Sequence, residues 1–322
     1  MSRFIQYATT CSAAALLLFV LVACGGTDAA TDDTGSADVS AWQDGDQYVL
    51  RLAPEQGRTF TITQTQRVVS DISVMGNEIQ NEQDQTFTAR MHIANRENGT
   101  TTLERTITRI QMESSGMGET MSYDSDDPES ESPIADAMGR MLNKTISIDL
   151  REDGSFAGDR DELEAAMSEL VEGDEQLEML VSNMTDGFLN QFQFYPTESI
   201  AIGDSWTEEA DVDLGVPLTL AMTYTLDSVE DTRAHISVEA DIDSEGAPME
   251  MGQGVSGEAF LTGSQSGTMV LDMPSGLLLE SSMDGDISGF VELQAPGQDG
   301  PVEMDMDITT TESYGIEPAD DE

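Results

Sequence analysis

Long stretches of the chain place an apolar residue at every second position. This holds over residues 218–226, 234–242 and 302–308, where threonine, serine or acidic residues fill most positions between. A period of two is the spacing at which a β-strand presents side chains on one face. Short turn-forming sequences such as Met75-Gly76-Asn77 join consecutive segments of this kind. The pattern predicts an antiparallel meander with one buried and one solvated face.

One strand carries an irregularity. Within residues 103–112 the apolar positions change parity between Ile107 and Ile110. An extra residue inserted into one strand of an antiparallel pair produces such a change, so the sequence predicts a β-bulge there.

The middle of the chain has helical spacing instead. Ser132-Pro133 is typical of a helix start, and residues 134–142, 159–171 and 177–188 each carry one apolar stripe opposite an acidic face. Helices of this kind lie on another layer. We therefore expect an α+β fold, in which a large curved antiparallel sheet, half-barrel-like, is covered on one face by about three amphipathic helices.

The charge balance excludes several classes of protein. The chain has 13 basic and 63 acidic side chains, for a formal net charge of −50. Nucleic-acid binding requires basic stripes, and docking on anionic lipid requires a polybasic patch. Lys144 is the only lysine, and acidic, lysine-poor proteins are typical of salt-adapted microbes, where salt screens the repulsion. We expect a halophilic or marine source, with an ordinary acidic envelope protein as the alternative.

The first residues indicate a targeting signal. Arg3 precedes an apolar run from Ala13 to Ala23, which is too short to span a bilayer. The run ends in Leu21, Val22, Ala23 and Cys24, which resembles a bacterial lipobox. That resemblance implies a signal peptide over residues 1–23 and a lipid attached to Cys24, so that the protein is anchored on the extracytoplasmic side of the cell envelope. An outer membrane or cell-surface location is favoured over the inner membrane.

The remaining chain divides by composition. Residues 24–46 are rich in Gly, Ala, Ser, Thr and Asp, which predicts a disordered acidic tether after the lipidated cysteine. Residues 47–315 show no break in composition and are expected to form a single α+β domain. Residues 316–322 are expected to be a disordered acidic tail.

Little in the sequence supports catalysis. Two histidines and no cysteine cluster cannot form a zinc site, and Gly263-Ser264-Gln265-Ser266-Gly267 has glutamine where a nucleophile elbow needs serine. The acidic run Tyr123-Asp124-Ser125-Asp126-Asp127-Pro128 invites calcium, although a solvated loop is the favoured interpretation. We expect no catalytic residues, no metal and no cofactor, and therefore not an enzyme.

Methionine is unusually frequent, with 19 residues. Flexible, polarizable Met suits a pocket that accepts variable apolar shapes, but it also serves as core filler, which is the favoured interpretation. If an apolar ligand binds between sheet and helices, the candidate pocket residues are Met138, Met141, Met167, Met184 and Met222.

Several short motifs together resemble an uncharacterised family of bacterial lipoproteins that is known only as a domain of unknown function. They are the long first hairpin, the acidic run 123–128, Tyr195-Pro196 with Gly203-Asp204-Ser205-Trp206, and the Gly267, Asp272 and Gly276 positions. The architecture is similar to LolA/LppX-like half-barrels, and this likeness implies binding of lipids or acylated cargo. It carries over no ligand residues. For Gly203 to Trp206 we favour a tight turn entering a strand, with Trp206 packed beneath.

Three functions remain open on this reading. The first is a membrane-anchored lipoprotein that binds an apolar or lipid ligand. The second is a structural or interaction lipoprotein of the envelope with a filled core and no ligand, whose protein partner the sequence does not identify. The third, an acid/base hydrolase, would require two carboxylates with raised pKa in one cleft.

Overall fold

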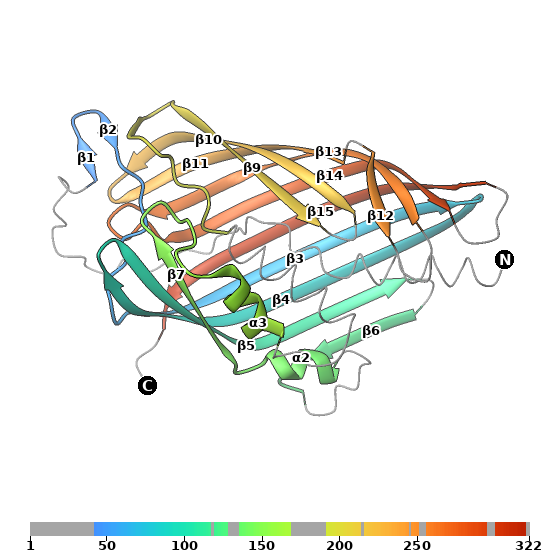
Figure 1. Cartoon of the computed structure of the whole chain (residues 1–322), viewed down its shortest axis with the longest axis horizontal. Coiled ribbons are helices and arrows are strands. Elements are labelled where there is room, and N and C mark those ends of the chain that lie inside the picture. The colour runs from blue at the N-terminus through green and yellow to red at the C-terminus, as the bar shows by residue number, and fades with distance from the viewer. Residues whose placement is uncertain are drawn as a thin grey trace.

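One large antiparallel β-sheet dominates the computed structural model (Figure 1), which describes residues 42–116, 119–127, 135–168, 191–213, 216–244, 246–250, 256–294 and 300–319. The sheet has twelve strands in the order β6-β5-β4-β3-β15-β14-β13-β11-β10-β9, with β12 paired to β13 and β7 paired to β5. Its strands are β3 (Thr59–Val74), β4 (Asn77–Glu97), β5 (Thr100–Gly116), β6 (Glu119–Asp124), β7 (Thr145–Arg151), β9 (Ser205–Asp213), β10 (Pro217–Glu230), β11 (Arg233–Asp243), β12 (Ala247–Glu250), β13 (Ser256–Asp272), β14 (Leu278–Gln294) and β15 (Val302–Pro318).

A second, three-stranded sheet is small. It pairs β1 (Gln43–Asp44), β2 (Gln47–Tyr48) and β8 (Ile200–Ala201). The N- and C-terminal parts of the large sheet meet where β3 pairs with β15, over Phe60 to Val74. This pairing joins two meanders into one continuous sheet.

The predicted alternation is confirmed. Along β10, β11 and β15 the apolar positions are buried and most positions between them are exposed. We call the face that carries the buried residues the inner face. The predicted bulge is also confirmed, because the register of β4 against β5 shifts where Thr88 pairs with Arg109 and Ala89 pairs with Ile107.

The expected α+β fold with about three covering helices is wrong. The described helices are α2 (Ala135–Met141) and α3 (Arg160–Ser168), and the third expected helix, over 177–188, lies outside the described residues. Seven- and nine-residue helices span roughly 10 and 14 Å, too little to cover strands of 16 to 21 residues. The protein is therefore mainly β.

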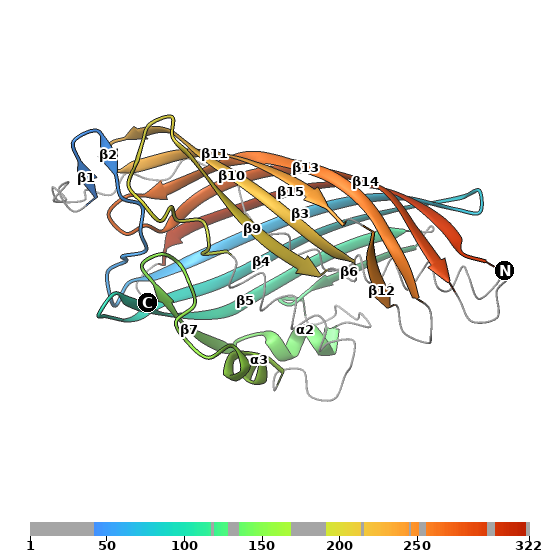
Figure 2. The same ribbon diagram turned by 45° about the horizontal axis from the view of Figure 1, so that its top comes forward.

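The sheet covers its own inner face instead. One hydrophobic cluster has members on every strand from β3 round to β9, among them Val68, Leu218 and Val212. Figures 1 and 2 both draw β9 across the central strands of the curved sheet. Sequence periodicity located the buried face correctly, but it did not reveal that the sheet folds over itself.

Residues 191–196 close one end of this curved sheet. The indole N–H of Trp206, on β9, donates to the carbonyl of Phe194 at 2.8 Å, and the Tyr195 hydroxyl donates to the carbonyl of Gly276 at 2.8 Å. Gly276 has φ +72°, and a Cβ there would lie 1.9 Å from the Arg51 carbonyl oxygen. Only glycine permits this close approach of chain segments.

Described strands lie on both sides of the limits 47 and 315 that were expected for the domain. Trp42 is buried and the β1–β2 hairpin begins inside the expected tether, while β15 continues into the expected tail as far as Pro318. Among the helices that the structure describes, none has the length and apolar character needed to cross a membrane.

Candidate functional site

Polar side chains interrupt the apolar inner face near the middle of the sheet. They are contributed by five adjacent strands, and each is less than a tenth exposed. We call this set the inner polar cluster; it consists of Gln66 on β3, Gln83 and Gln85 on β4, Gln265 on β13, Ser281 on β14, and Thr310 and Glu312 on β15. Strand register places them on one face, since Glu312 pairs with Gln66 and Gln66 pairs with Gln85.

A relay of hydrogen bonds runs through the cluster. The Nε2 of Gln83 donates to Oε1 of Gln85 at 3.3 Å, and Nε2 of Gln85 donates to Oε1 of Gln66. The Nε2 of Gln66 then donates to Oε1 of Glu312 at 2.7 Å. All three glutamine amides donate in the direction of Glu312, so the relay ends on the Glu312 carboxyl.

Glu312 is enclosed by the fold. Its side chain is 2% exposed, and burial raises its pKa well above the ordinary value, while the Gln66 hydrogen bond lowers it by less. A buried carboxylate with one neutral donor is far less stable than the protonated acid. Burial therefore favours the protonated, neutral form of Glu312.

Three buried polar atoms of this cluster, among the residues that the structure describes, have no hydrogen-bond partner. They are Oε2 of Glu312, Nε2 of Gln265 and Oγ of Ser281. They come from the adjacent strands β15, β13 and β14. Gln265 pairs with Gly285 of β14. Ser281 is four positions from Gly285 along that strand, which is roughly 13 Å. Each such atom costs about 1–3 kcal/mol if nothing satisfies it.

Glycine at position 285 brings Gln265 close to Thr310. Gln265 and Thr310 pair with Gly285 from opposite sides. A Cβ at Gly285 would lie 2.7 Å from Oγ1 of Thr310 and 3.4 Å from Cγ of Gln265. The two side chains thus lean over the glycine, which joins Gln265 to the part of the cluster on β15.

Apolar clusters flank the polar one along the strands. One contains Ile62, Met91 and Tyr314 and extends to the closed end, and two others contain Val68 and Ile72. The inner face therefore offers apolar surface on both sides of a hydrogen-bonding group of residues. This arrangement suits an amphiphilic molecule with an uncharged polar group.

The structure does not bring the methionine candidates together. Met138 and Met141 pack from α2 against β5 and β6 in one cluster, while Met167 and Met222 belong to the large cluster at the closed end. Met184 lies outside the described residues. The sulfur of Met222 accepts a hydrogen bond from the Tyr224 hydroxyl at 3.2 Å. The four described methionines are buried core residues, the interpretation that the sequence favoured.

The lipobox residues Leu21, Val22, Ala23 and Cys24 also lie outside the described residues. The lipid attachment at Cys24 remains a prediction.

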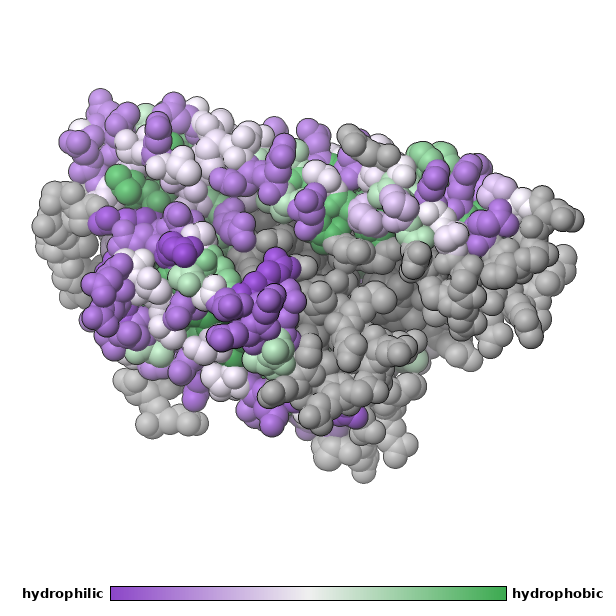
Figure 3. Space-filling view, viewed as in Figure 1, coloured by the Kyte–Doolittle hydropathy of each residue, from purple (hydrophilic) through white to green (hydrophobic). Residues whose placement is uncertain are grey.

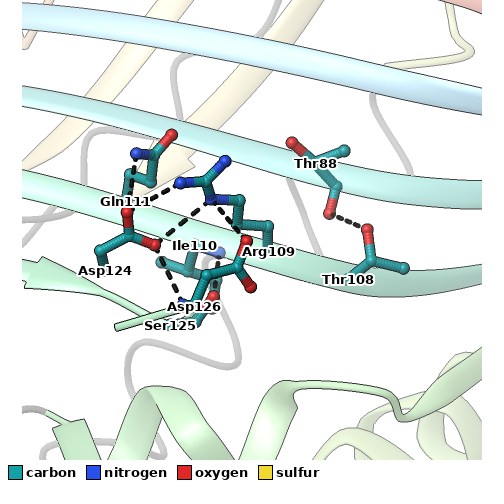
Figure 4. A network of polar contacts seen from close by, with 8 residues as sticks. All are labelled: Thr88, Thr108, Arg109, Ile110, Gln111, Asp124, Ser125 and Asp126. Atoms are coloured by element: carbon teal, nitrogen blue, oxygen red, sulfur yellow. Dashed lines mark hydrogen bonds and ion pairs between the residues drawn. The ribbon is translucent and has the colours of Figure 1, made fainter. Parts of the chain in front are cut away.

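The acidic run at residues 123–127 has a structural role. Figure 4 shows Asp124 held by Arg109 and Gln111 of β5, on the outer face of the sheet. Nη2 of Arg109 lies 2.8 Å from Oδ2 of Asp124, and hydrogen bonding to Arg109 and to the Asp126 N–H lowers the Asp124 pKa to about 2. The Ser125 hydroxyl accepts the Ile110 N–H at 3.0 Å. These contacts fasten β6 to β5 and already use the oxygens that a cation would need.

The turn interpretation of Gly203 to Trp206 is confirmed. Gly203 has φ +91°, and Oδ2 of Asp204 accepts the Ala201 N–H at 2.8 Å. β9 begins at Ser205, and Trp206 stacks on Tyr224 at 5.5 Å between ring centroids.

Sequence reasoning missed the inner polar cluster, although a signal was present. Gln66, Gln83, Gln85 and Gln265 occupy positions whose parity is that of the buried residues on their strands. Long amides at buried positions of an alternating strand are unusual because each must find hydrogen-bond partners.

Comparison with known families gives one match. Residues 98–278, more than half of the chain, match the family described as "Family of unknown function (DUF6263)". The matched residues include Gln265 but not Glu312. A comparison with functionally curated proteins gives no significant match.

Solved structures offer only distant similarity. The outer membrane protein OprG from Pseudomonas aeruginosa is 7% identical, with a TM-score of 0.21, and the match covers 83% of this chain and 100% of that one. The COG4313 outer membrane channel from Pseudomonas putida F1 is 7% identical, with a TM-score of 0.22 and coverages of 85% and 99%. The translocator domain of autotransporter NalP from Neisseria meningitidis is 8% identical, with a TM-score of 0.18 and coverages of 80% and 88%. At such low scores these likenesses support no argument about this protein.

Proposed function

The chain belongs to DUF6263, a family of unknown function, and we propose from its own geometry that it is a lipid-anchored envelope protein that binds an amphiphilic ligand on its inner face. The ligand lies within the curve of the sheet, rather than between a sheet and a layer of helices. Its polar group contacts the inner polar cluster and its apolar part lies along the flanking clusters.

The unpartnered Oε2 of the buried Glu312 carries this proposal. A protein that needed only a stable core would place leucine or valine at this position, as it does along most of the inner face. Nε2 of Gln265 and Oγ of Ser281, on neighbouring strands, are likewise buried without a hydrogen-bond partner. Because Ser281 is roughly 13 Å along β14 from the residue that pairs with Gln265, a ligand that satisfies all three atoms must carry polar atoms at more than one position.

The anchor part of the proposal rests on the lipobox at residues 21–24. Cys24→Ser should abolish incorporation of an alkyne-labelled fatty acid during growth and move the protein out of the membrane fraction. Cys11→Ser, within the expected signal, is the matched control and should leave both unchanged. Labelling that survives in Cys24→Ser would overturn the anchor.

Ligand binding is tested on the full chain purified from its own envelope. Native mass spectrometry in volatile salt should show a stoichiometric mass beyond the acylated polypeptide, and organic extraction should release it as an amphiphile. Glu312→Leu should lose that mass, whereas Glu303→Leu, on the exposed face of the same strand, should retain it. An apo mass for the wild-type protein, with no uptake of added lipids, would refute the binding function.

The interaction-protein alternative finds less support in the described surface. That surface is largely hydrophilic in the view of Figure 3. The large exposed hydrophobic residues Met75, Met121, Ile202 and Phe260 belong to four different turns or strands.

The hydrolase alternative needs two carboxyls that act together. Burial raises the pKa of Glu208 as well as that of Glu312, and both side chains face inward. Glu208, on β9, acts on the pKa of Tyr224, however, whereas the pKa of Glu312 is set by burial and by its hydrogen bond with Gln66. No hydrogen bond connects the two groups in the described structure, so this alternative lacks the geometry it requires.

A further inference from the structure

The inner polar cluster presents hydrogen-bond donors to whatever binds there. Each amide in the relay from Gln83 through Gln85 to Gln66 passes its donor toward Glu312. Oε1 of Glu312 is the last acceptor, so the proton of the neutral carboxyl is on Oε2, which has no partner. The second unpartnered atom, Nε2 of Gln265, is an amide nitrogen and can only donate.

The surrounding charges do not change this assignment. The inward groups with perturbed pKa values are Tyr314 on the same strand, Tyr224 on β10, Glu208 on β9, Arg105 on β5 and Tyr195 in residues 191–196. Arg105 donates to Oε1 of Gln191 at 3.3 Å, and Tyr195 donates to Gly276. Gln66 alone donates to Glu312 among the described residues. No described cation forms a salt bridge with Glu312 to stabilise its charged form.

Resting on the proposed function, we propose that Glu312 and Gln265 donate hydrogen bonds to an uncharged acceptor oxygen of the ligand, such as the carbonyl of an ester or amide. The Ser281 hydroxyl, which can donate or accept, extends the same site. An acylated molecule, with a carbonyl at the junction of its apolar and polar parts, has the required chemistry.

Charged head groups do not fit this site. A carboxylate or phosphate would be buried against neutral donors without a cation from the cluster, and burial of an uncompensated charge is costly. An ammonium group would need acceptors, whereas Gln265 and the protonated Glu312 offer it donors. The donors of Gln265 and of the protonated Glu312 therefore favour an uncharged acceptor oxygen over a charged group.

The test compares four probes that share one chain length: hexadecane, methyl palmitate, palmitate and hexadecylamine. Each is offered from the same mixed micelles to the full chain, and the bound fraction is measured by native mass spectrometry. The wild-type protein should bind methyl palmitate about tenfold more tightly than hexadecane, the effect of one good hydrogen bond in a buried site. Palmitate and hexadecylamine should bind more weakly than methyl palmitate.

Two substitutions separate hydrogen bonding from shape. Glu312→Gln keeps a neutral N–H donor of similar shape and should retain the preference for methyl palmitate within about threefold. Glu312→Leu removes the donor and should reduce that preference about tenfold. Glu303→Leu is the surface control and should change nothing.

Infrared difference spectra give a readout that does not need the leucine variant to fold. The wild-type protein minus Glu312→Gln should show the carbonyl band of a protonated carboxyl at neutral pH. This band should move to lower frequency when methyl palmitate binds and stay unchanged with hexadecane. Absence of the band would overturn the inference.

The outcomes distinguish the two proposals. If no probe binds, the proposed function fails, and this inference fails with it. If hexadecane binds as tightly as methyl palmitate, ligand binding stands but the hydrogen-bond inference is wrong. Preference for palmitate or hexadecylamine, or an ester preference unchanged in Glu312→Leu, would also overturn the inference.

Discussion

Replacing Glu312 with glutamine should make the stability of the fold less dependent on pH. Burial raises the pKa of Glu312 well above its ordinary value of 4.5. A group whose folded-state pKa is raised contributes stability that is fully present below the unfolded pKa. That stability is lost as the pH rises toward and through the folded pKa. The wild-type protein must take up a proton to fold in this window, whereas the glutamine variant does not.

The magnitude follows from proton linkage. One proton taken up on folding costs about 1.4 kcal/mol per pH unit across the interval between the two pKa values. Two pH units within this interval amount to about 2.8 kcal/mol, against a total stability of about 5–15 kcal/mol for a typical domain. Glu312→Gln preserves the 2.7 Å contact with Nε2 of Gln66 through its own carbonyl oxygen, so little else changes.

The assay is urea unfolding of both proteins at pH 5, 6, 7 and 8 in one salt concentration. The two proteins share all other acidic residues, whose contribution cancels in the difference. The free energy of unfolding of Glu312→Gln relative to wild type should increase as the pH rises from 5 toward the folded-state pKa of Glu312. A difference that stays constant from pH 5 to 8 would show that Glu312 is not held neutral, and the reasoning about the inner polar cluster would fail.

Three further predictions follow from particular residues. Gly267→Ala should destabilise the protein by about 3 kcal/mol in urea unfolding, because the added Cβ would lie 1.6 Å from the Ser282 carbonyl oxygen. The control is Gly139→Ala in α2, where the added Cβ meets open space. This control should be neutral or stabilising by up to about 1 kcal/mol. Arg109→Gln should raise the Asp124 pKa from about 2 toward 3.8 in a carbon NMR titration. During acidification, the variant should then lose the stabilising contribution of the Asp124 carboxylate at a higher pH than the wild-type protein does. An unchanged titration midpoint would contradict the role of Arg109. The net charge of −50 predicts a melting temperature that rises from about 0.05 to about 2 M NaCl, and a flat or falling curve would refute salt adaptation.

Local chemistry made much of the fold predictable. The two-residue period along residues 218–226 and 234–242 identified the buried face of β10 and β11, because strand geometry converts spacing directly into direction. The parity change between Ile107 and Ile110 located the bulge for the same reason. At the start of α3, the Asp159 carboxylate accepts the Asp161 N–H at 2.9 Å, as expected of a residue before a helix.

The layer that covers the inner face could not be predicted in this way. An apolar stripe on a short helix shows that the helix packs on something, but not how much of the sheet it covers. The position of β9 across the central strands depends on the curvature summed over many strands. Glycines such as Gly267, pressed against the neighbouring strand, contribute to that curvature, and no local period records it.

For the candidate site, too, the sequence determined some features and only the tertiary structure determined the others. The sequence by itself determined that Gln66, Gln85 and Glu312 share the parity of buried residues on their strands. Only the tertiary structure decided that Glu312 lies beside Gln66, 246 positions earlier in the chain, because the pairing of β15 with β3 joins the two ends of the sheet. The raised pKa of Glu312 likewise results from burial by distant segments, since the pKa of a carboxyl depends on the solvent and partners that the whole fold leaves to it.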